Sequence, residues 1–345
     1  MYRWLALLLL MSALVFATSC QGVRQWQLEA PQGDGTKKEG PIKLAVVPKA
    51  LGFDFWEKVR LGAECAASEH DDVQMVWDGV SQETDVNGQY DLLRTYITQG
   101  VDGIVYAATD AKVLGQVTQQ ALDNGITVVN IDSGTDPQPP DVPVMATDNV
   151  SAAVNVPKLL SDELAKQGKD GGKIAFIPFQ PGTGTNDQRK EGFNESLKDY
   201  PELNVVAEQS SQSDYVQGLQ VTENVLTANP DLDGIFAANE PGVLGAAEGL
   251  RRPDEAGNVI LVGWDGSPLE EQELREGIIK ALVVQNPFEM GYEGVETAVK
   301  KIRENAEAES QHTSVTLINN DNVDEPEVQA VLHPSCDNPP IRTSF

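Results

Sequence analysis

The sequence predicts an α/β fold of two Rossmann-like lobes, each built on a parallel sheet. From residue 42 onward, short β-rich runs alternate with amphipathic stretches. The runs are continuously apolar, which is typical of strands that helices cover on both faces. The segments QGVDGIVYAATDA (99–111) and NPDLDGIFAANEP (229–241) look like one unit written twice, and 345 residues are too many for one comfortable core. We therefore expect two lobes that share one plan.

The first 20 residues, MYRWLALLLLMSALVFATSC, are expected to be an export signal. Their apolar run, Leu5 to Phe16, is too short for a spanning helix, which needs about 20 residues. Small residues directly before Cys20 resemble the lipobox of bacterial lipoproteins, so residues 1–20 are expected to be a lipoprotein signal peptide with lipidation at Cys20. An ordinary secreted protein is the alternative. Residues 21–41, rich in Gln, Gly and Lys, are expected to be a disordered tether.

Two series of expected strands follow the tether, with a helical stretch after nearly every strand. The first series is IKLAVVP, VQMVWDG, DGIVYAA and ITVVNIDS. The second is KIAFIPF, NVVAEQS, DGIFAAN, VILVGWDG and IKALVVQNP. Strands separated in this way by helices predict parallel pairing within each lobe.

Side chains at the ends of these strands are the candidate ligand-binding groups, because ligands of open parallel sheets bind beyond the carboxyl ends of the strands. The ends carry aromatic rings, carboxylates and amides with few cations. Aromatic faces stack on the C–H face of a sugar ring, and carboxylates and amides bind hydroxyls, so the set fits a neutral polyhydroxylated ligand. Two alternatives stay open: Asp132, Asn239 and Asp265 as helix N-caps, and Phe55, Trp56 and Trp264 as core residues.

The formal net charge of −28 disfavours nucleic acid and anionic membranes as partners. No glycine-rich dinucleotide turn and no Gly-x-Ser-x-Gly pentapeptide occurs, and the three histidines are scattered. We expect neither an enzyme nor a cofactor or metal site. If Cys20 carries lipid, Cys65 and Cys336 can pair as a disulfide in an oxidising compartment. A small buried thiol at Cys65 is the alternative.

Residues 42–332 resemble the ribose/galactose-type periplasmic sugar-binding proteins of ABC importers. The resemblance rests on FDFWEKVRLGA, YAATD, VVNIDS, GTGTNDQRKEGF, IFAANEPGVLGA, LVGWDGSP and VVQNP, in that order along the chain. It implies one aromatic wall from Phe55 and Trp56 and a second from Trp264. The implied polar ligand contacts are Asp132, Ser133, Asn186, Asp187, Arg189, Asn239, Asp265 and Gln285.

The resemblance departs from the ribose binder at three positions. Phe53 and Ala107 replace asparagines, and Ser133 replaces a ligand-binding arginine. The family's next arginine falls at either Asp187 or Arg189. These changes disfavour ribose itself and favour a larger or differently substituted sugar, or a polyol.

The resemblance also implies a type I periplasmic binding protein fold with a three-segment hinge. The N-terminal lobe would comprise residues 42–146 and 286–314, the C-terminal lobe residues 147–285 and 315–332, and residues 333–345 a tail. The implied protein is a monomer that traps its sugar between closing lobes and passes it to a membrane permease. It would sit in the periplasm or cell envelope, in contact with the membrane only through the lipid at Cys20. A sensory sugar-binding protein for a chemoreceptor or histidine kinase, or a binder of a nucleoside or amine, is the alternative.

Overall fold

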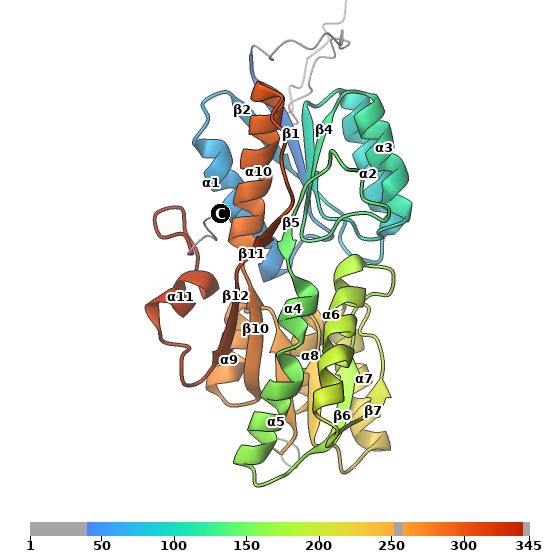
Figure 1. The fold of residues 1–345 in the computed structure, drawn as a ribbon, viewed down its shortest axis with the longest axis vertical. Coiled ribbons are helices and arrows are strands. Elements are labelled where there is room, and N and C mark those ends of the chain that lie inside the picture. The colour runs from blue at the N-terminus through green and yellow to red at the C-terminus, as the bar shows by residue number, and fades with distance from the viewer. Residues whose placement is uncertain (1–39, 252–257, 341–345) are drawn as a thin grey trace, which may run out of the picture.

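The computed structural model describes residues 40–251 and 258–340, which form two α/β lobes stacked along the long axis of the molecule (Figure 1). The predicted fold class is confirmed. The sheet of the N-terminal lobe has the order β11-β5-β4-β3-β1-β2, and all its neighbouring strands pair in parallel. Its strands are β1 (Ile42–Val47), β2 (Val73–Trp77), β3 (Gly103–Tyr106), β4 (Thr127–Ile131), β5 (Val144–Thr147) and β11 (Gln311–Thr313).

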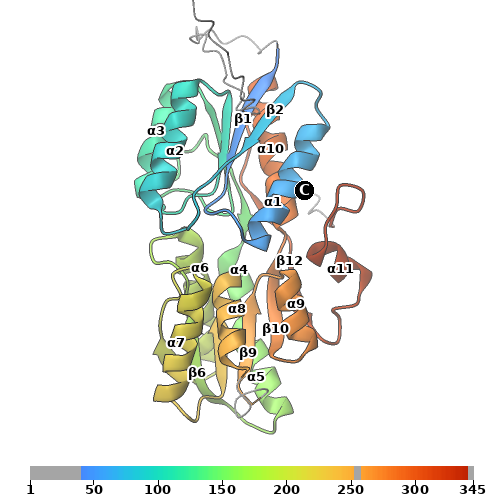
Figure 2. The same cartoon turned by 180° about the vertical axis from the view of Figure 1, so that it is seen from behind.

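Two pairs of helices cover the two faces of this sheet (Figures 1 and 2). On one face lie α1 (Asp54–Ser68) and α10 (Pro287–Glu304), and on the other α2 (Val86–Gln99) and α3 (Val113–Asp123). The backbones of α1 and α10 come very close: a Cβ on Gly62 would lie 2.0 Å from the Phe288 carbonyl oxygen, and one on Gly291 would lie 1.9 Å from that of Val59. Glycine at these two positions lets the helices pack.

The sheet of the C-terminal lobe repeats the same plan in the order β12-β10-β9-β8-β6-β7. Its edge strand β12 runs antiparallel to β10, whereas the other pairs are parallel. The expectation of a parallel sheet therefore holds except at this edge. The strands are β6 (Gly172–Ile177), β7 (Leu203–Glu208), β8 (Gly234–Ala237), β9 (Ile260–Trp264), β10 (Ile279–Gln285) and β12 (Val315–Asn319).

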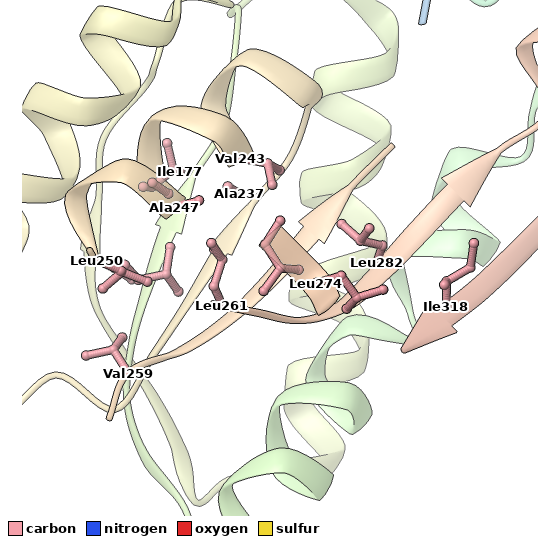
Figure 3. Close-up of a cluster of buried hydrophobic side chains, with 14 of the residues drawn as sticks. Ile177, Ala237, Val243, Ala247, Leu250, Val259, Leu261, Leu274, Leu282 and Ile318 are labelled. Carbon is pink, nitrogen blue, oxygen red and sulfur yellow. The ribbon is translucent and has the colours of Figure 1, made fainter. Parts of the chain in front are cut away.

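Helices also cover both faces of the second sheet. One apolar core joins it to α7 (Tyr215–Ala228), α8 (Glu240–Gly249), α9 (Pro268–Arg275) and α11 (Pro326–Leu332); Figure 3 shows Val243, Leu261 and Leu274 within it. The other face carries α4 (Asn149–Ala153), α5 (Val156–Lys166) and α6 (Gly184–Ser196), which is followed by the 3₁₀ turn Leu197–Asp199. Each sheet is therefore buried on both sides, which explains its continuously apolar strands.

The chain passes between the two sheets three times: between β5 and α4, between β10 and α10, and between β11 and β12. The disulfide between Cys65 and Cys336 is present, with the two Cα atoms 5.6 Å apart. Cys65 belongs to α1 of the N-terminal lobe, whereas Cys336 follows α11, whose Leu332 packs in the core of the C-terminal lobe. The disulfide is therefore a fourth connection between the lobes.

The expected signal peptide, the lipidation site Cys20 and the tether up to residue 39 lie outside the described residues. Within residues 40–251 and 258–340, no helix is long and apolar enough to cross a membrane.

Candidate functional site

Side chains of both lobes line one cavity at the ends of the strands, and the empty space within it and at its opening to solvent is about 320 Å³. Among the predicted site residues, Phe55, Trp56, Asp132, Arg189, Asn239, Asp265 and Gln285 line this cavity. The other lining residues are Lys49, Phe53, Glu83, Phe179, Thr185, Glu240 and Pro241.

The first turn of α1 supplies the aromatic wall of the N-terminal lobe. Phe55 and Trp56 meet edge to face, with ring centroids 4.8 Å apart. Both rings also pack in the apolar core between α1, α10 and the sheet. The Trp56 indole N–H donates to Glu83 Oε1 at 3.2 Å. Core packing and this hydrogen bond fix the wall before any ligand arrives.

Two aspartates stand at equivalent places in the two lobes. Asp132 directly follows β4 and Asp265 directly follows β9, and both have a positive φ, 58° and 83°. This left-handed conformation is uncommon outside glycine and costs about 1–3 kcal/mol, so its use at both strand ends is typical of a functional site. It turns both carboxylates into one cavity.

Both aspartates are buried and held by neighbours. Asp132 forms an ion pair of 2.6 Å with Lys49. Asp265 accepts hydrogen bonds from the Gln285 amide at 2.7 Å and from the Glu240 backbone N–H at 3.0 Å. Burial raises the pKa of the Asp265 carboxyl, and the charge of Arg189 opposes that rise.

Arg189 of α6 is the buried cation of the C-terminal lobe, with only 2% of its surface exposed. It donates to Asn149 Oδ1 at 2.8 Å and to the Ala238 carbonyl oxygen at 2.6 Å. Its guanidinium carbon lies 4.3 Å from the centroid of the Trp264 ring and 5.1 Å from that of Phe179, a cation–π arrangement. Burial lowers the pKa of Arg189, and the neighbouring carboxylates oppose this effect.

The expectation that Trp264 forms the second aromatic wall is corrected by this geometry. Trp264 has no exposed surface, packs near Phe236 and lies beneath Arg189, so it does not line the cavity. The ring in the wall of this lobe is Phe179. Trp264 instead supports Arg189 from behind, as the core alternative implied.

Three other predicted residues lie outside the lining. The Ser133 hydroxyl donates to the Ala108 carbonyl oxygen and lines a neighbouring surface pocket. Asn186 accepts a hydrogen bond of 3.0 Å from the Phe179 backbone N–H and donates to Asp187, which is exposed. Of the two positions considered for the family's arginine, Arg189 is the one in the cavity. Asn186 acts on the cavity through Phe179.

Sequence reasoning missed the bonds that cross the cavity. Lys49 donates to Thr185 of the opposite lobe at 3.0 Å. Glu83 accepts from Ser213 of the opposite lobe at 2.6 Å, and burial raises the pKa of this carboxyl. Lys49 stands just past the end of β1, so the strand-end rule could have found it. Glu83 lies in the loop after β2, where nothing in the sequence marks it.

Asn239 caps α8, because its side chain accepts from the Gly242 N–H, and it also donates to Ser213 while lining the cavity. Asn239 therefore has both roles that the sequence left open, as the N-cap of a helix and as a residue of the cavity lining. The lining as a whole carries two cations, Lys49 and Arg189, and four acidic side chains: Glu83, Asp132, Glu240 and Asp265. Within the described ranges no group of histidine, cysteine and acidic residues could hold a metal ion.

Residues 44–306 match the family model described as a periplasmic binding protein domain. This chain belongs to the periplasmic binding protein family. It is 33% identical over 264 residues to the D-ribose/D-allose-binding protein of Pseudomonas aeruginosa, covering 75% of this chain and 81% of that one. It is 28% identical to the D-allose-binding periplasmic protein of Escherichia coli, covering 74% and 83%.

Solved structures of this family have the same fold. A carbohydrate transporter solute-binding protein from Agrobacterium radiobacter in complex with D-arabinose superposes with a TM-score of 0.81, at 28% identity, covering 86% of this chain and all of that one. An ABC transporter solute-binding protein from Agrobacterium vitis with bound D-fucose gives a TM-score of 0.78 at 29% identity, covering 84% and 100%. The similarity spans both lobes, and a periplasmic location follows from the family.

Proposed function

We propose that this protein is the substrate-binding component of a sugar ABC importer. It would trap a neutral monosaccharide or polyol between its lobes, carry out no chemical reaction, and deliver the ligand to a membrane permease. The observation that carries the proposal is a cavity between the lobes that has aromatic rings on both sides and a buried aspartate from each sheet. Relatives that bind ribose, allose, arabinose and fucose support it.

The cavity offers complementary groups to a sugar ring. Phe55 and Trp56 on one side and Phe179 on the other present apolar surface to the C–H faces. Asp132 and Asp265 accept hydrogen bonds from hydroxyls, while Arg189 and Asn239 can donate to them. Because each buried group must find a partner, an analogue that lacks one hydroxyl leaves a group unpaired and binds more weakly.

The three interlobe crossovers would act as the hinge, with residues 42–146 and 286–314 moving against residues 147–285 and 315–332. Ligand binding then shifts the population toward the closed form by its differential affinity for that form. We further propose that Cys20 carries the lipid anchor and that the protein acts as a monomer at the cell envelope.

A cationic ligand is the second candidate, because the lining carries more carboxyl groups than cations. The experiment is a thermal-shift screen with D-ribose, D-allose, D-arabinose, D-fucose and polyols, beside a panel of amines and nucleosides. At a hundredfold excess over Kd, a true ligand adds about 2.7 kcal/mol to the free energy of unfolding. A shift with sugars supports the proposal, whereas shifts confined to amines or nucleosides contradict it. Reconstitution with the permease then separates import from sensing.

A further inference from the structure

The first turn of α1 and the start of α8 meet across the cavity, although they belong to different lobes. Glu240 is the first residue of α8, and its side chain is 7% exposed. Its Oε1 accepts a hydrogen bond from the Asp54 N–H at 3.2 Å, and its Oε2 accepts one from the Phe55 N–H at 3.0 Å. One carboxyl group of the C-terminal lobe thus binds two backbone donors of the N-terminal lobe.

These two donors belong to the end of α1, where N–H groups have no acceptor within the helix. The N-cap residue of α1, Phe53, makes no side-chain cap. By contrast, α2 is capped by its own Asp85. Glu240 therefore supplies the hydrogen-bond acceptors that the sequence of α1 does not provide at this end of the helix.

The backbone of Glu240 also contacts a side chain that lines the ligand cavity. Its N–H donates to Asp265 Oδ2 at 3.0 Å. A second bond across the lobes lies beside it, because Lys58 of α1 donates to the Gly266 carbonyl oxygen at 2.6 Å. The first turns of α1 therefore dock on the segments that follow β8 and β9, and Glu240 joins the aromatic wall to the aspartate opposite.

We propose that Glu240 is a closure latch, a positioning residue that stabilises the closed form by capping α1 from the opposite lobe. The inference rests on the proposed function, since closure is what encloses the ligand. When the lobes part, the Glu240 carboxyl group is exposed to water, and the Asp54 and Phe55 N–H groups lose it as their acceptor. Its effect falls on the equilibrium between open and closed forms, so it changes the apparent affinity for every ligand by one common factor.

The test is Glu240→Gln, which keeps the shape of the side chain and replaces one acceptor oxygen with an NH2 group that faces a backbone N–H. Kd values for D-ribose, D-allose, D-arabinose and D-fucose are measured by calorimetry on wild type and variant. We expect each sugar that binds to lose about tenfold in affinity, by the same factor and through faster dissociation. The ligand-free variant should still unfold cooperatively, as the wild-type protein does.

The matched control is Glu248→Gln on the same helix, where the side chain is exposed and its ion pair with Arg251 is 3.6 Å long. It should leave all affinities unchanged. Losses for Glu240→Gln that differ from sugar to sugar would show that Glu240 reads the ligand, and no loss would show that the cap does not hold the lobes. Either result overturns the latch.

The two proposals fail differently. If no sugar binds the wild-type protein, the sugar-binding proposal fails, and X-ray scattering of the ligand-free proteins decides the latch. The radius of gyration should then be larger for Glu240→Gln than for wild type and Glu248→Gln. Equal radii in that case would overturn the latch.

Discussion

Some residues of the site line the cavity, and others support the lining residues from behind. Phe179 lines the cavity, whereas Trp264 lies behind Arg189. The strand-end rule placed Asp132, Asp265 and Gln285 correctly at the cavity, because the carboxyl ends of strands from both sheets face the space between the lobes. The rule could not predict that Phe179 lines the cavity and Trp264 does not. The direction of a side chain at a strand end depends on tertiary packing, which the sequence pattern does not show.

Trp264→Ala is expected to act first on stability. The side chain is fully buried, so its removal should cost about 3–5 kcal/mol of unfolding free energy. Chemical denaturation measures this loss directly. Phe179→Leu, which changes the wall and keeps much of the apolar volume, should weaken sugar binding at a smaller cost in stability. A Trp264→Ala protein of normal stability that no longer binds sugar would place Trp264 in the wall after all.

Binding should weaken as the pH rises from about 5 to 8. Burial raises the pKa of the Glu240 carboxyl from its usual value of 4.5 to about 7 in the closed form. The Asp265 and Asp54 charges add to the rise, and the hydrogen bonds from the Phe55 and Asp54 N–H groups oppose it without cancelling it. A raised pKa means that the closed form favours the protonated acid, so its advantage is full below the lower value and is lost as the pH passes the higher one. Burial shifts the pKa of Asp265 and Glu83 in the same direction.

Calorimetry across this pH range checks the sign, and Glu240→Gln should give a flatter profile than wild type. Affinity that increases toward pH 8 would contradict the assignment of these buried acids.

At the scale of elements, the sequence could place the strands and helices because their apolar patterns are local. The bonds between elements were less accessible. Glu83 and Lys49 reach their partners Ser213 and Thr185 only when the lobes come together. The partners lie more than a hundred residues apart in the chain, and a contact over that separation produces no periodic pattern in the sequence. The antiparallel direction of β12 was not predicted for a related reason. The direction of an edge strand depends on the path of the last crossover between the lobes.

The close packing of α1 against α10 makes its own prediction. Gly291→Ala would place a Cβ 1.9 Å from the Val59 carbonyl oxygen, so the helices must separate, at a cost of about 1–3 kcal/mol. The control is Gly115→Ala in α3, where the nearest atom is 3.9 Å away and alanine should stabilise the helix slightly. Thermal unfolding of both variants measures the difference. Equal melting temperatures would mean that the two helices adjust freely.

For the whole molecule, composition and repetition sufficed to predict two lobes, because alternating strands and helices leave few other arrangements. The sequence left two alternatives for Cys65, a disulfide with Cys336 or a buried free thiol. It could not decide between them, because it does not show that the segment after α11 returns to α1. The bond closes a loop with a sequence separation of 271 residues.

The double variant Cys65→Ala/Cys336→Ala should be less stable than wild type. The lost chain entropy of the unfolded state predicts about 5.6 kcal/mol for a loop of this length, and engineered disulfides often deliver less than this prediction. Differential scanning calorimetry with and without a reductant measures the effect. Reductant should lower the melting temperature of wild type toward that of the variant and leave the variant unchanged; a reductant-insensitive wild type would contradict the bond.

The same bond bounds how far the two halves of the molecule can move. Four residues lead from Leu332, seated in one core, to Cys336, bonded to a helix of the other. A fully extended chain covers at most ~3.5 Å per residue, so Leu332 and Cys336 lie at most about 14 Å apart. With the 5.6 Å between the Cα atoms of Cys336 and Cys65, the Cα atoms of Leu332 and Cys65 stay within about 20 Å of each other. The oxidised protein is therefore restricted in how far its lobes can separate on this side, and reduction of the bond would remove that restriction.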